Sequence, residues 1–284
     1  MASKRFEIPE GIKPVLSADD IIGMAPALAS HRKLVERLLH MLKVDEVNYV
    51  HSRFCDTPGT EFVRRLVEDD LNLKLRVDNA TVLEHLPKGP FITVSNHPFG
   101  ALDGIVLIYL ITRYRPEYKV MVNMVLNRLW AMSPNFIAVD PMASADPAKK
   151  AVSMRGIKEA IMQVRSGNPI GFFPAGAMSK VNWRLRLQDR PWQENIIRLI
   201  MQLDVPVIPV FFNGTNSWWF NFLGVACWQA RTLRLPAEIF RKRNKEIHVS
   251  VGNPISSEVL KKHSSSTEEL GRFLRERTYS LRCK

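Results

Sequence analysis

FITVSNHPFGALDG, residues 91–104, joins an apolar strand to an apolar segment through a loop that carries a histidine and an aspartate. Residues 91–94 are typical of a short buried strand, and residues 104–112 of an apolar helix or turn region. His97 and Asp103 therefore lie on a strand-to-helix connection, where α/β proteins bind their ligands. An imidazole can take a proton from a hydroxyl group while a carboxylate on its other nitrogen holds the required tautomer. We predict that these two residues form a catalytic pair.

Apolar runs alternate with helical patterns along most of the chain. Strands are predicted at residues 73–77, 91–95, 119–123, 136–139, 170–173, 207–212 and 246–251. Before them, residues 19–69 show leucines at helical spacing among charged residues, which predicts amphipathic helices. Such helices more commonly pack on a protein core than bind a membrane surface. The prediction is an α/β fold with a mixed, mostly parallel sheet flanked by helices. An N-terminal helical lobe, residues 1–70, precedes the α/β domain, residues 71–284.

Four short segments, in order, resemble the motifs of the glycerol-3-phosphate and 1-acylglycerol-3-phosphate acyltransferase (PlsC-like) superfamily. They are Asn96-His97 with Asp103, Val139-Asp140, Phe173-Pro174-Ala175-Gly176-Ala177-Met178-Ser179, and Val207-Ile208-Pro209-Val210. Together they span roughly residues 80 to 215. The chain is most similar to the hemolysin-like branch, whose members resemble aminolipid (ornithine or glycine lipid) O-acyltransferases.

The departures from the family motifs are also informative. Five residues separate His97 from Asp103, where the family has four, and Gly100 is the position best suited to the extra residue. The third of these segments, residues 173–179, is called the third block below. It carries Met178 where the family has an arginine associated with the acceptor's phosphate. A guanidinium recognises phosphate through two parallel hydrogen bonds, so its loss argues against a phosphorylated acceptor.

The resemblance implies an acyl-ACP or acyl-CoA dependent O-acyltransferase that esterifies a lyso-lipid hydroxyl, with a lyso-aminolipid as the expected acceptor. His97 and Asp103 would be catalytic, and no cofactor or metal would be required. Backbone N–H groups near Gly176 are expected to stabilise the oxyanion. Residues expected to support the loop or bind substrate are Asn96, Phe173, Pro174, Gly176, Ser179, Arg184 and Arg186.

The chain has 40 Lys and Arg against 28 Asp and Glu, a formal net charge of +12. Such a charge attracts anions, and for a lipid acyltransferase we expect acyl carrier protein and an anionic membrane surface. The arginines at 184 and 186 belong to a basic group that either binds such an anion or forms a solvated face. Nucleic acid is not an expected partner, because no basic run is interleaved with aromatics and no zinc spacing is present.

Cellular location and cysteine use are predicted from weaker signals. The opening residues lack the apolar segment of a signal peptide, so we expect a cytoplasmic protein on the inner face of the membrane. Cys55, Cys227 and Cys283 show no C-x-x-C spacing, which predicts a reducing compartment and no metal site. Residues 217–223, SWWFNFL, are predicted to be a loop that contacts the membrane, lines an acyl groove or packs in the core.

Two alternatives stay open at this point. The chain could act on 1-acylglycerol-3-phosphate through other basic residues. It could also be an inactive, basic, peripheral membrane-binding scaffold, since the third block lacks the family's Glu and Arg. Retention of both His97 and Asp103 favours an enzyme.

Overall fold

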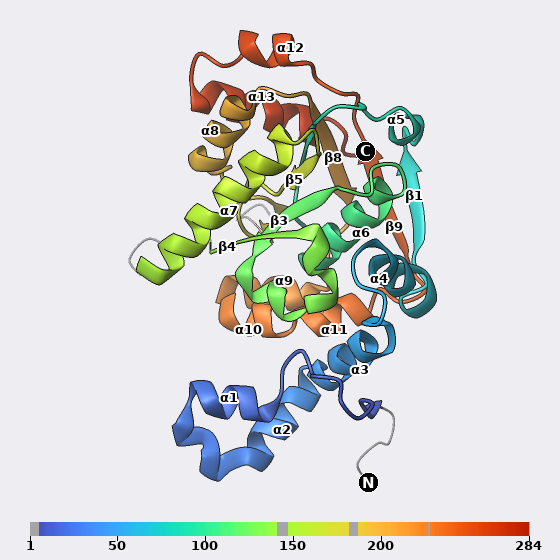
Figure 1. Cartoon of the computed structure of the whole chain (residues 1–284), viewed down its shortest axis with the longest axis vertical. Helices are drawn as coiled ribbons and strands as arrows, with labels where there is room; N and C mark the ends of the chain where they lie inside the picture. Colours follow the sequence, from blue (N-terminus) through green and yellow to red (C-terminus); the bar gives the residue numbers. More distant parts are fainter. Residues whose placement is uncertain (1–5, 141–146, 182–186, 227, 284) are drawn as a thin grey trace.

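The structure is a computed structural model that describes residues 6–140, 147–181, 187–226 and 228–283. Its centre is a sheet of seven strands in the order β1-β9-β8-β2-β5-β3-β4 (Figure 1). These strands are β1 (Lys74–Asp78), β2 (Ile92–Ser95), β3 (Lys119–Asn123), β4 (Phe136–Val139), β5 (Ile170–Phe172), β8 (Val207–Asn213) and β9 (Glu246–Val251). Each corresponds to a strand predicted from the sequence.

Strand direction divides the sheet in two. Strands β8, β2, β5, β3 and β4 are mutually parallel, while β9 pairs antiparallel with β8 and parallel with β1. The prediction of a mixed, mostly parallel sheet is confirmed. A separate two-stranded ribbon, β6 (Lys180–Val181) and β7 (Leu187–Gln188), was not predicted, because two-residue strands leave no periodic signal.

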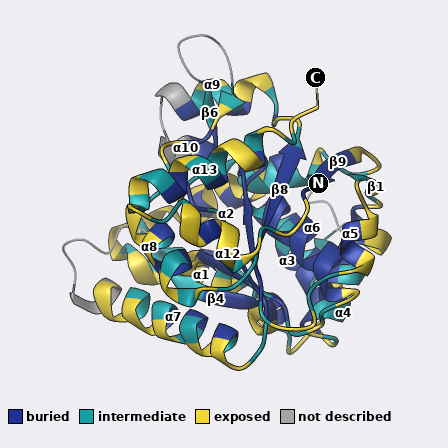
Figure 2. Ribbon diagram, turned by 90° about the horizontal axis from the view of Figure 1, so that it is seen from above, coloured by how far each residue is buried: buried dark blue, intermediate teal, exposed yellow. Residues whose placement is uncertain are grey.

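Helices cover both faces of the sheet, and each face has its own apolar core (Figure 2). One core includes α6 (Ala101–Thr112), which is buried along almost its whole length, together with α4 (Thr60–Arg65). The other lies beneath α7 (Pro147–Arg165), α8 (Glu194–Leu203) and α13 (Thr267–Tyr279). The remaining α-helices are α1 (Ala18–Met24), α2 (Arg32–Met41), α3 (Val44–Phe54), α5 (Thr81–Glu84), α9 (Trp218–Ala226), α10 (Trp228–Leu233), α11 (Leu235–Phe240) and α12 (Ser257–Lys262).

The N-terminal helices differ in how they join this core. Helices α1 and α2 lie apart from the sheet, at the lower end of Figure 1, around a small cluster that includes Val35 and Leu39. Helices α3 and α4 instead contribute Phe54 and Phe62 to the same core as the sheet. The division of the chain at residue 70 stays a prediction.

One predicted loop is a helix. Residues 217–223 were expected to form a loop, but α9 occupies Trp218–Ala226, and the Phe220 N–H donates to the Ser217 hydroxyl at its start. The prediction was wrong because the prolines lie before the apolar run, and Asn221 within it does not prevent the run from forming a helix. Phe220 is fully buried, whereas Trp218, Trp219 and Phe222 are exposed and pack on one another.

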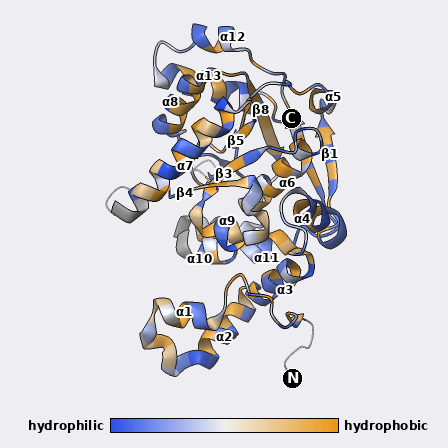
Figure 3. Cartoon of the chain, in the orientation of Figure 1, coloured by the Kyte–Doolittle hydropathy of each residue, from blue (hydrophilic) through white to orange (hydrophobic). Residues whose placement is uncertain are grey.

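Apolar side chains are also exposed on α2, where Leu34, Leu38 and Met41 face solvent. Orange segments alternate with blue ones along α2 in Figure 3. Within the described part of the chain, none of the helices has the length and apolar character needed to cross a bilayer.

Candidate active site

The site lies where three neighbouring parallel strands end. His97 follows β2, Phe173 follows β5, and Asn213 ends β8. Because β2 pairs in parallel with both β5 and β8, the three strands end at the same edge of the sheet. Segments 97–103, 173–179 and 213–217 are therefore brought together although they are far apart in sequence.

His97 and Asp103 are in direct contact. Nδ1 of His97 lies 2.9 Å from Oδ2 of Asp103, and the Asp103 side chain is fully buried. The distance is within hydrogen-bond range, and the two groups carry opposite charges only when the ring is protonated. Nε2, on the other side of the ring, is the nitrogen left to meet a substrate.

Backbone groups also bind the carboxylate oxygen that faces His97. The same Oδ2 accepts the N–H groups of Phe99 at 2.9 Å and Gly100 at 3.0 Å. Asp103 lies in the first turn of α6, where a carboxylate also interacts favourably with the helix dipole. Burial raises the pKa of Asp103, and the His97 ring and these two N–H groups oppose the rise.

Gly100 accommodates the extra residue of this loop, as its position predicted. Its φ is +77°, a conformation that side chains disfavour, and it precedes α6 directly. A Cβ atom here would lie 2.7 Å from Sδ of Met178 and 2.8 Å from Cδ1 of Leu235. The loop can therefore pack closely against the third block only with glycine at this position.

The third block lies alongside residues 97–103, which we call the histidine loop. The Phe173 ring packs on the His97 ring with centroids 4.2 Å apart, and the Ser179 N–H donates to the His97 carbonyl at 2.9 Å. Gly176 has φ +63°, and its own N–H donates to the Phe173 carbonyl. Pro174 is buried, and its carbonyl accepts the N–H of Gln193.

Asn96 fixes the histidine loop to the neighbouring strand. Its side-chain amide donates to the Phe212 carbonyl at 3.0 Å, and its oxygen accepts the Phe212 N–H at 2.7 Å. Both polar ends of this buried side chain are thus used within the protein. Arg184 and Arg186, the two predicted binding arginines, lie outside the described residues.

Sequence reasoning missed Asp189, which joins the two loops. Its Oδ1 accepts the Ser179 hydroxyl at 2.5 Å and the His97 N–H at 3.2 Å. The Asp189 N–H donates to the Tyr279 hydroxyl on α13. In the sequence, Asp189 is marked only as an acidic residue within a basic stretch. That feature does not indicate that it contacts His97 or Ser179.

Arg231 was also missed, because it is far from the motifs in sequence. It is buried beside the third block, and Nη2 donates to the Ser179 carbonyl at 2.7 Å. Burial, with a smaller contribution from Arg190, lowers the pKa of Arg231 to about 10. Burial and the charges of Arg190 and Arg231 also lower the pKa of Lys180. Positive charge therefore gathers next to Ser179.

A cavity of about 220 Å³ adjoins the histidine loop. Its lining includes Asn96, Pro98, Ser179, Tyr279 and Cys283. It lies on the side of the loop that faces β8 and the end of the chain.

Comparisons with known proteins place the chain in a family. A sequence model of the family described as "Acyltransferase" matches residues 20–284. A lyso-glycine lipid O-acyltransferase of Bacteroides thetaiotaomicron is 29% identical over 256 residues, covering 87% of this chain and 89% of the relative. A protein with the same name from Phocaeicola vulgatus is 26% identical over 258 residues, covering 88% of each.

Among solved structures, the chain is similar to that of the 1-acyl-sn-glycerophosphate (LPA) acyltransferase PlsC from Thermotoga maritima. That similarity has a TM-score of 0.49 at 15% identity, and it covers 94% of this chain and 88% of the other.

Proposed function

Because the chain belongs to the acyltransferase family, we propose that it transfers a fatty acyl chain from a thioester donor to the hydroxyl of a lyso-aminolipid. The observation that carries the proposal is the His97–Asp103 pair at the end of β2, 2.9 Å apart and held by the backbone of its own loop. The acceptor supplies the nucleophilic oxygen, so no serine or cysteine nucleophile is needed.

In the proposed mechanism, the acceptor hydroxyl donates its hydrogen bond to Nε2 of His97. That nitrogen takes the proton as the oxygen attacks the thioester carbonyl carbon. Asp103 holds the ring through Nδ1 and stabilises the imidazolium that forms. When the tetrahedral intermediate collapses, the carbon–sulfur bond breaks and His97 returns the proton to the leaving thiolate. The new ester bond replaces the thioester bond, and the proton taken from the acceptor hydroxyl ends on the released thiol.

The oxyanion of the intermediate requires hydrogen-bond donors. We place them on the turn of the third block, as the motif resemblance suggests. Since the Gly176 N–H already donates to Phe173, the candidates are the N–H groups of the residues that follow, Ala177 and Met178.

Two facts support a lyso-aminolipid acceptor. Both curated relatives, each matching more than four fifths of the chain, are named lyso-glycine lipid O-acyltransferases. In addition, Met178, which takes the place of the family's phosphate-associated arginine, lies against Gly100 in the site. A thioether offers a phosphate neither charge nor a hydrogen-bond donor.

The positive charge at Lys180, Arg190 and Arg231 supports binding of an anionic donor. Acyl carrier protein and the phosphates of coenzyme A are both anionic, and the cluster adjoins the third block beside His97. The same charge could hold the phosphate of 1-acylglycerol-3-phosphate, and the assay below distinguishes these roles.

We also propose that the protein works at an anionic membrane surface, on its cytoplasmic side. The exposed aromatic cluster of α9 and the exposed apolar residues of α2 are the candidate contacts. Exposed Lys33 and Arg37 lie beside the apolar residues of α2. Exposed apolar side chains next to cations are typical of proteins that bind lipid headgroup regions.

The decisive experiment measures acyl transfer by the purified protein. Labelled acyl carrier protein and acyl-CoA are offered separately, each with lysophosphatidate and with a lyso-aminolipid that carries a free hydroxyl. Transfer to the lyso-aminolipid is expected, and His97→Ala should lower the rate by about 10³-fold or more. His85→Ala, at an exposed histidine on the loop after α5, is the matched control and should retain full activity.

Each other outcome contradicts a defined part of the proposal. Transfer to lysophosphatidate alone would refute the acceptor assignment and give the phosphate role to the basic cluster. Binding to anionic vesicles without transfer from either donor would support the inactive scaffold. Substantial activity in folded His97→Ala would exclude His97 as the base.

A further inference from the structure

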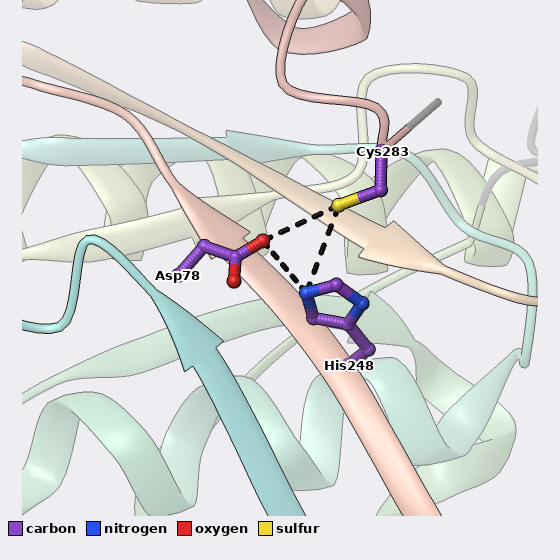
Figure 4. Close-up of side chains that lie close together, drawn as sticks. All are labelled: Asp78, His248 and Cys283. Atoms are coloured by element: carbon purple, nitrogen blue, oxygen red, sulfur yellow. Dashed lines mark hydrogen bonds and ion pairs between the residues drawn. The ribbon is translucent and has the colours of Figure 1, made fainter.

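Three side chains with metal-binding atoms converge at a second place in the fold, outside the His97–Asp103 site (Figure 4). Asp78 ends β1, His248 is in β9, and Cys283 follows α13 near the end of the chain. Oδ2 of Asp78 lies 2.6 Å from Nε2 of His248 and 3.3 Å from Sγ of Cys283, and Sγ lies 3.7 Å from Nε2. Carboxylate, imidazole and thiolate are the usual ligands of zinc.

The spacing of the three atoms matches a zinc centre. The point equidistant from them in their own plane is about 1.9 Å from each, slightly less than zinc's bond lengths of about 2.0–2.3 Å. An ion at zinc distance would therefore lie roughly 1 Å out of that plane. In a regular tetrahedral site the ligand atoms lie about 3.3–3.8 Å apart, so the two distances from Sγ already fit, and the 2.6 Å between Asp78 and His248 would widen by about 0.7 Å on binding.

The arrangement differs from that of a nucleophile with its base. In a Cys-His-Asp relay, the thiol and the carboxylate contact different nitrogens of the imidazole ring. Here Asp78 and Cys283 both approach Nε2 of His248 (Figure 4). Convergence of all three groups on one point favours a shared ion over proton transfer.

Neighbouring polar groups hold the three side chains in this orientation. The Ser250 hydroxyl donates to Oδ2 of Asp78 at 3.0 Å and accepts from the Asn213 side-chain amide at 2.9 Å. The other end of that amide accepts the Cys283 N–H at 3.0 Å. Metal ligands in proteins are commonly oriented by such outer hydrogen bonds.

We propose that Asp78, His248 and Cys283 bind one Zn²⁺ ion, with water in the fourth position. The thiolate and the carboxylate together balance the charge of the ion. Binding would release the thiol proton, while the proton that His248 shares with Asp78 would move to Nδ1 so that Nε2 can bind the ion, and bonds to zinc would replace the mutual hydrogen bonds. The side chains of Asp78 and His248 are 40% and 18% exposed, and Cys283 is exposed, so an ion can enter directly from solvent.

Zinc at this point would tie the end of the chain to the sheet. Cys283 also lines the cavity beside Asn96 and Ser179. The ion would therefore fix one wall of the cavity that adjoins the histidine loop. The cysteine spacing had predicted no metal site, because the ligands come from three segments that only the folded chain brings together.

The test is a metal titration of the full chain in a reductant that does not bind zinc. Co²⁺, which reports on coordination, is added first and Zn²⁺ is then used to displace it. We expect one equivalent of Co²⁺ to produce thiolate-to-metal charge-transfer absorption together with the visible bands of a tetrahedral ion. Zn²⁺ should remove both signals stoichiometrically.

Single substitutions identify which side chains bind the ion. Cys283→Ser should abolish the charge-transfer band and weaken Zn²⁺ binding at least about 100-fold, and His248→Gln should weaken it similarly. Cys55→Ser, at a buried cysteine whose thiol donates to the Ser52 carbonyl, is the matched control and should bind as the parent does. Because Cys283 is exposed near the chain end, its replacement should leave thermal unfolding without metal unchanged.

The proposal would be overturned if Co²⁺ gave no charge-transfer band. It would equally be overturned if Cys283→Ser bound Zn²⁺ as tightly as the parent, or if Cys55→Ser alone lost binding. Acyl transfer does not enter these measurements, so they stand apart from the proposed function.

Discussion

Replacing Asp103 with asparagine separates its chemical role from its structural one. The asparagine oxygen can still accept the N–H groups of Phe99 and Gly100, which the carboxylate accepts at 2.9 and 3.0 Å. Because Oδ2 makes all three contacts, the asparagine oxygen in its place would also face Nδ1 of His97, but without the negative charge. Nδ1 would keep its proton and its acceptor, but the imidazolium that forms when His97 takes the acceptor's proton would lose the adjacent buried charge that stabilises it.

The two roles predict different magnitudes. Loss of the carboxylate charge beside the imidazolium should lower kcat/KM by about 10³- to 10⁴-fold, equivalent to about 4–5.5 kcal/mol of transition-state stabilisation. The free energy of unfolding should change by less than about 1 kcal/mol, since both backbone donors keep an acceptor and the buried charge is removed. Asp103→Ala leaves both donors unpaired and should destabilise the fold by about 1–3 kcal/mol per donor.

Acyl-transfer kinetics and denaturant unfolding on the same preparations check these values. Asp45→Asn is the matched control, because Asp45 forms an exposed pair with His40 at 2.8 Å, and its activity should equal that of the parent. The reasoning is refuted if folded Asp103→Asn keeps more than about a tenth of the parent kcat/KM.

Three further predictions concern stability and membrane binding. Burial lowers the pKa of His51 from 6.5 to about 4, so the unfolded chain binds an extra proton between these values and the free energy of unfolding should fall by about 3 kcal/mol as pH drops through that window. Urea denaturation at both ends of the window should show this loss in the parent and not in His51→Gln. A Cβ at Gly171 would lie 2.0 Å from the buried Tyr118 hydroxyl, so Gly171→Ala should lower the free energy of unfolding by about 1–3 kcal/mol, and an unchanged melting temperature would contradict the packing described. Replacing Trp218 and Trp219, 74% and 55% exposed, with alanine should weaken binding to anionic vesicles about tenfold or more, and equal sedimentation of the double variant and the parent would exclude α9 as the contact.

The local elements of the fold were readable in the sequence. Residues 91–95 are mostly apolar and the helix at residues 101–112 is apolar except for Asp103 and Thr112, so burial of each could be expected from the sequence. His97 and Asp103 lie six positions apart on one tight loop, so their contact depends mainly on that loop's own backbone. The glycine at position 100 supplies the positive φ that the loop requires.

Contacts between distant segments were decided by the tertiary structure. Asp189 reaches His97 and Ser179 because the ribbon β6–β7 turns the chain back toward the site, and nothing in its neighbourhood in sequence specifies that return. Asp78, His248 and Cys283 meet only because β1 and β9 pair in a particular register and the chain end docks on Asn213. Hydrophobic periodicity determines which residues are buried, whereas strand order and register, set by packing of the whole core, determine which polar groups become neighbours.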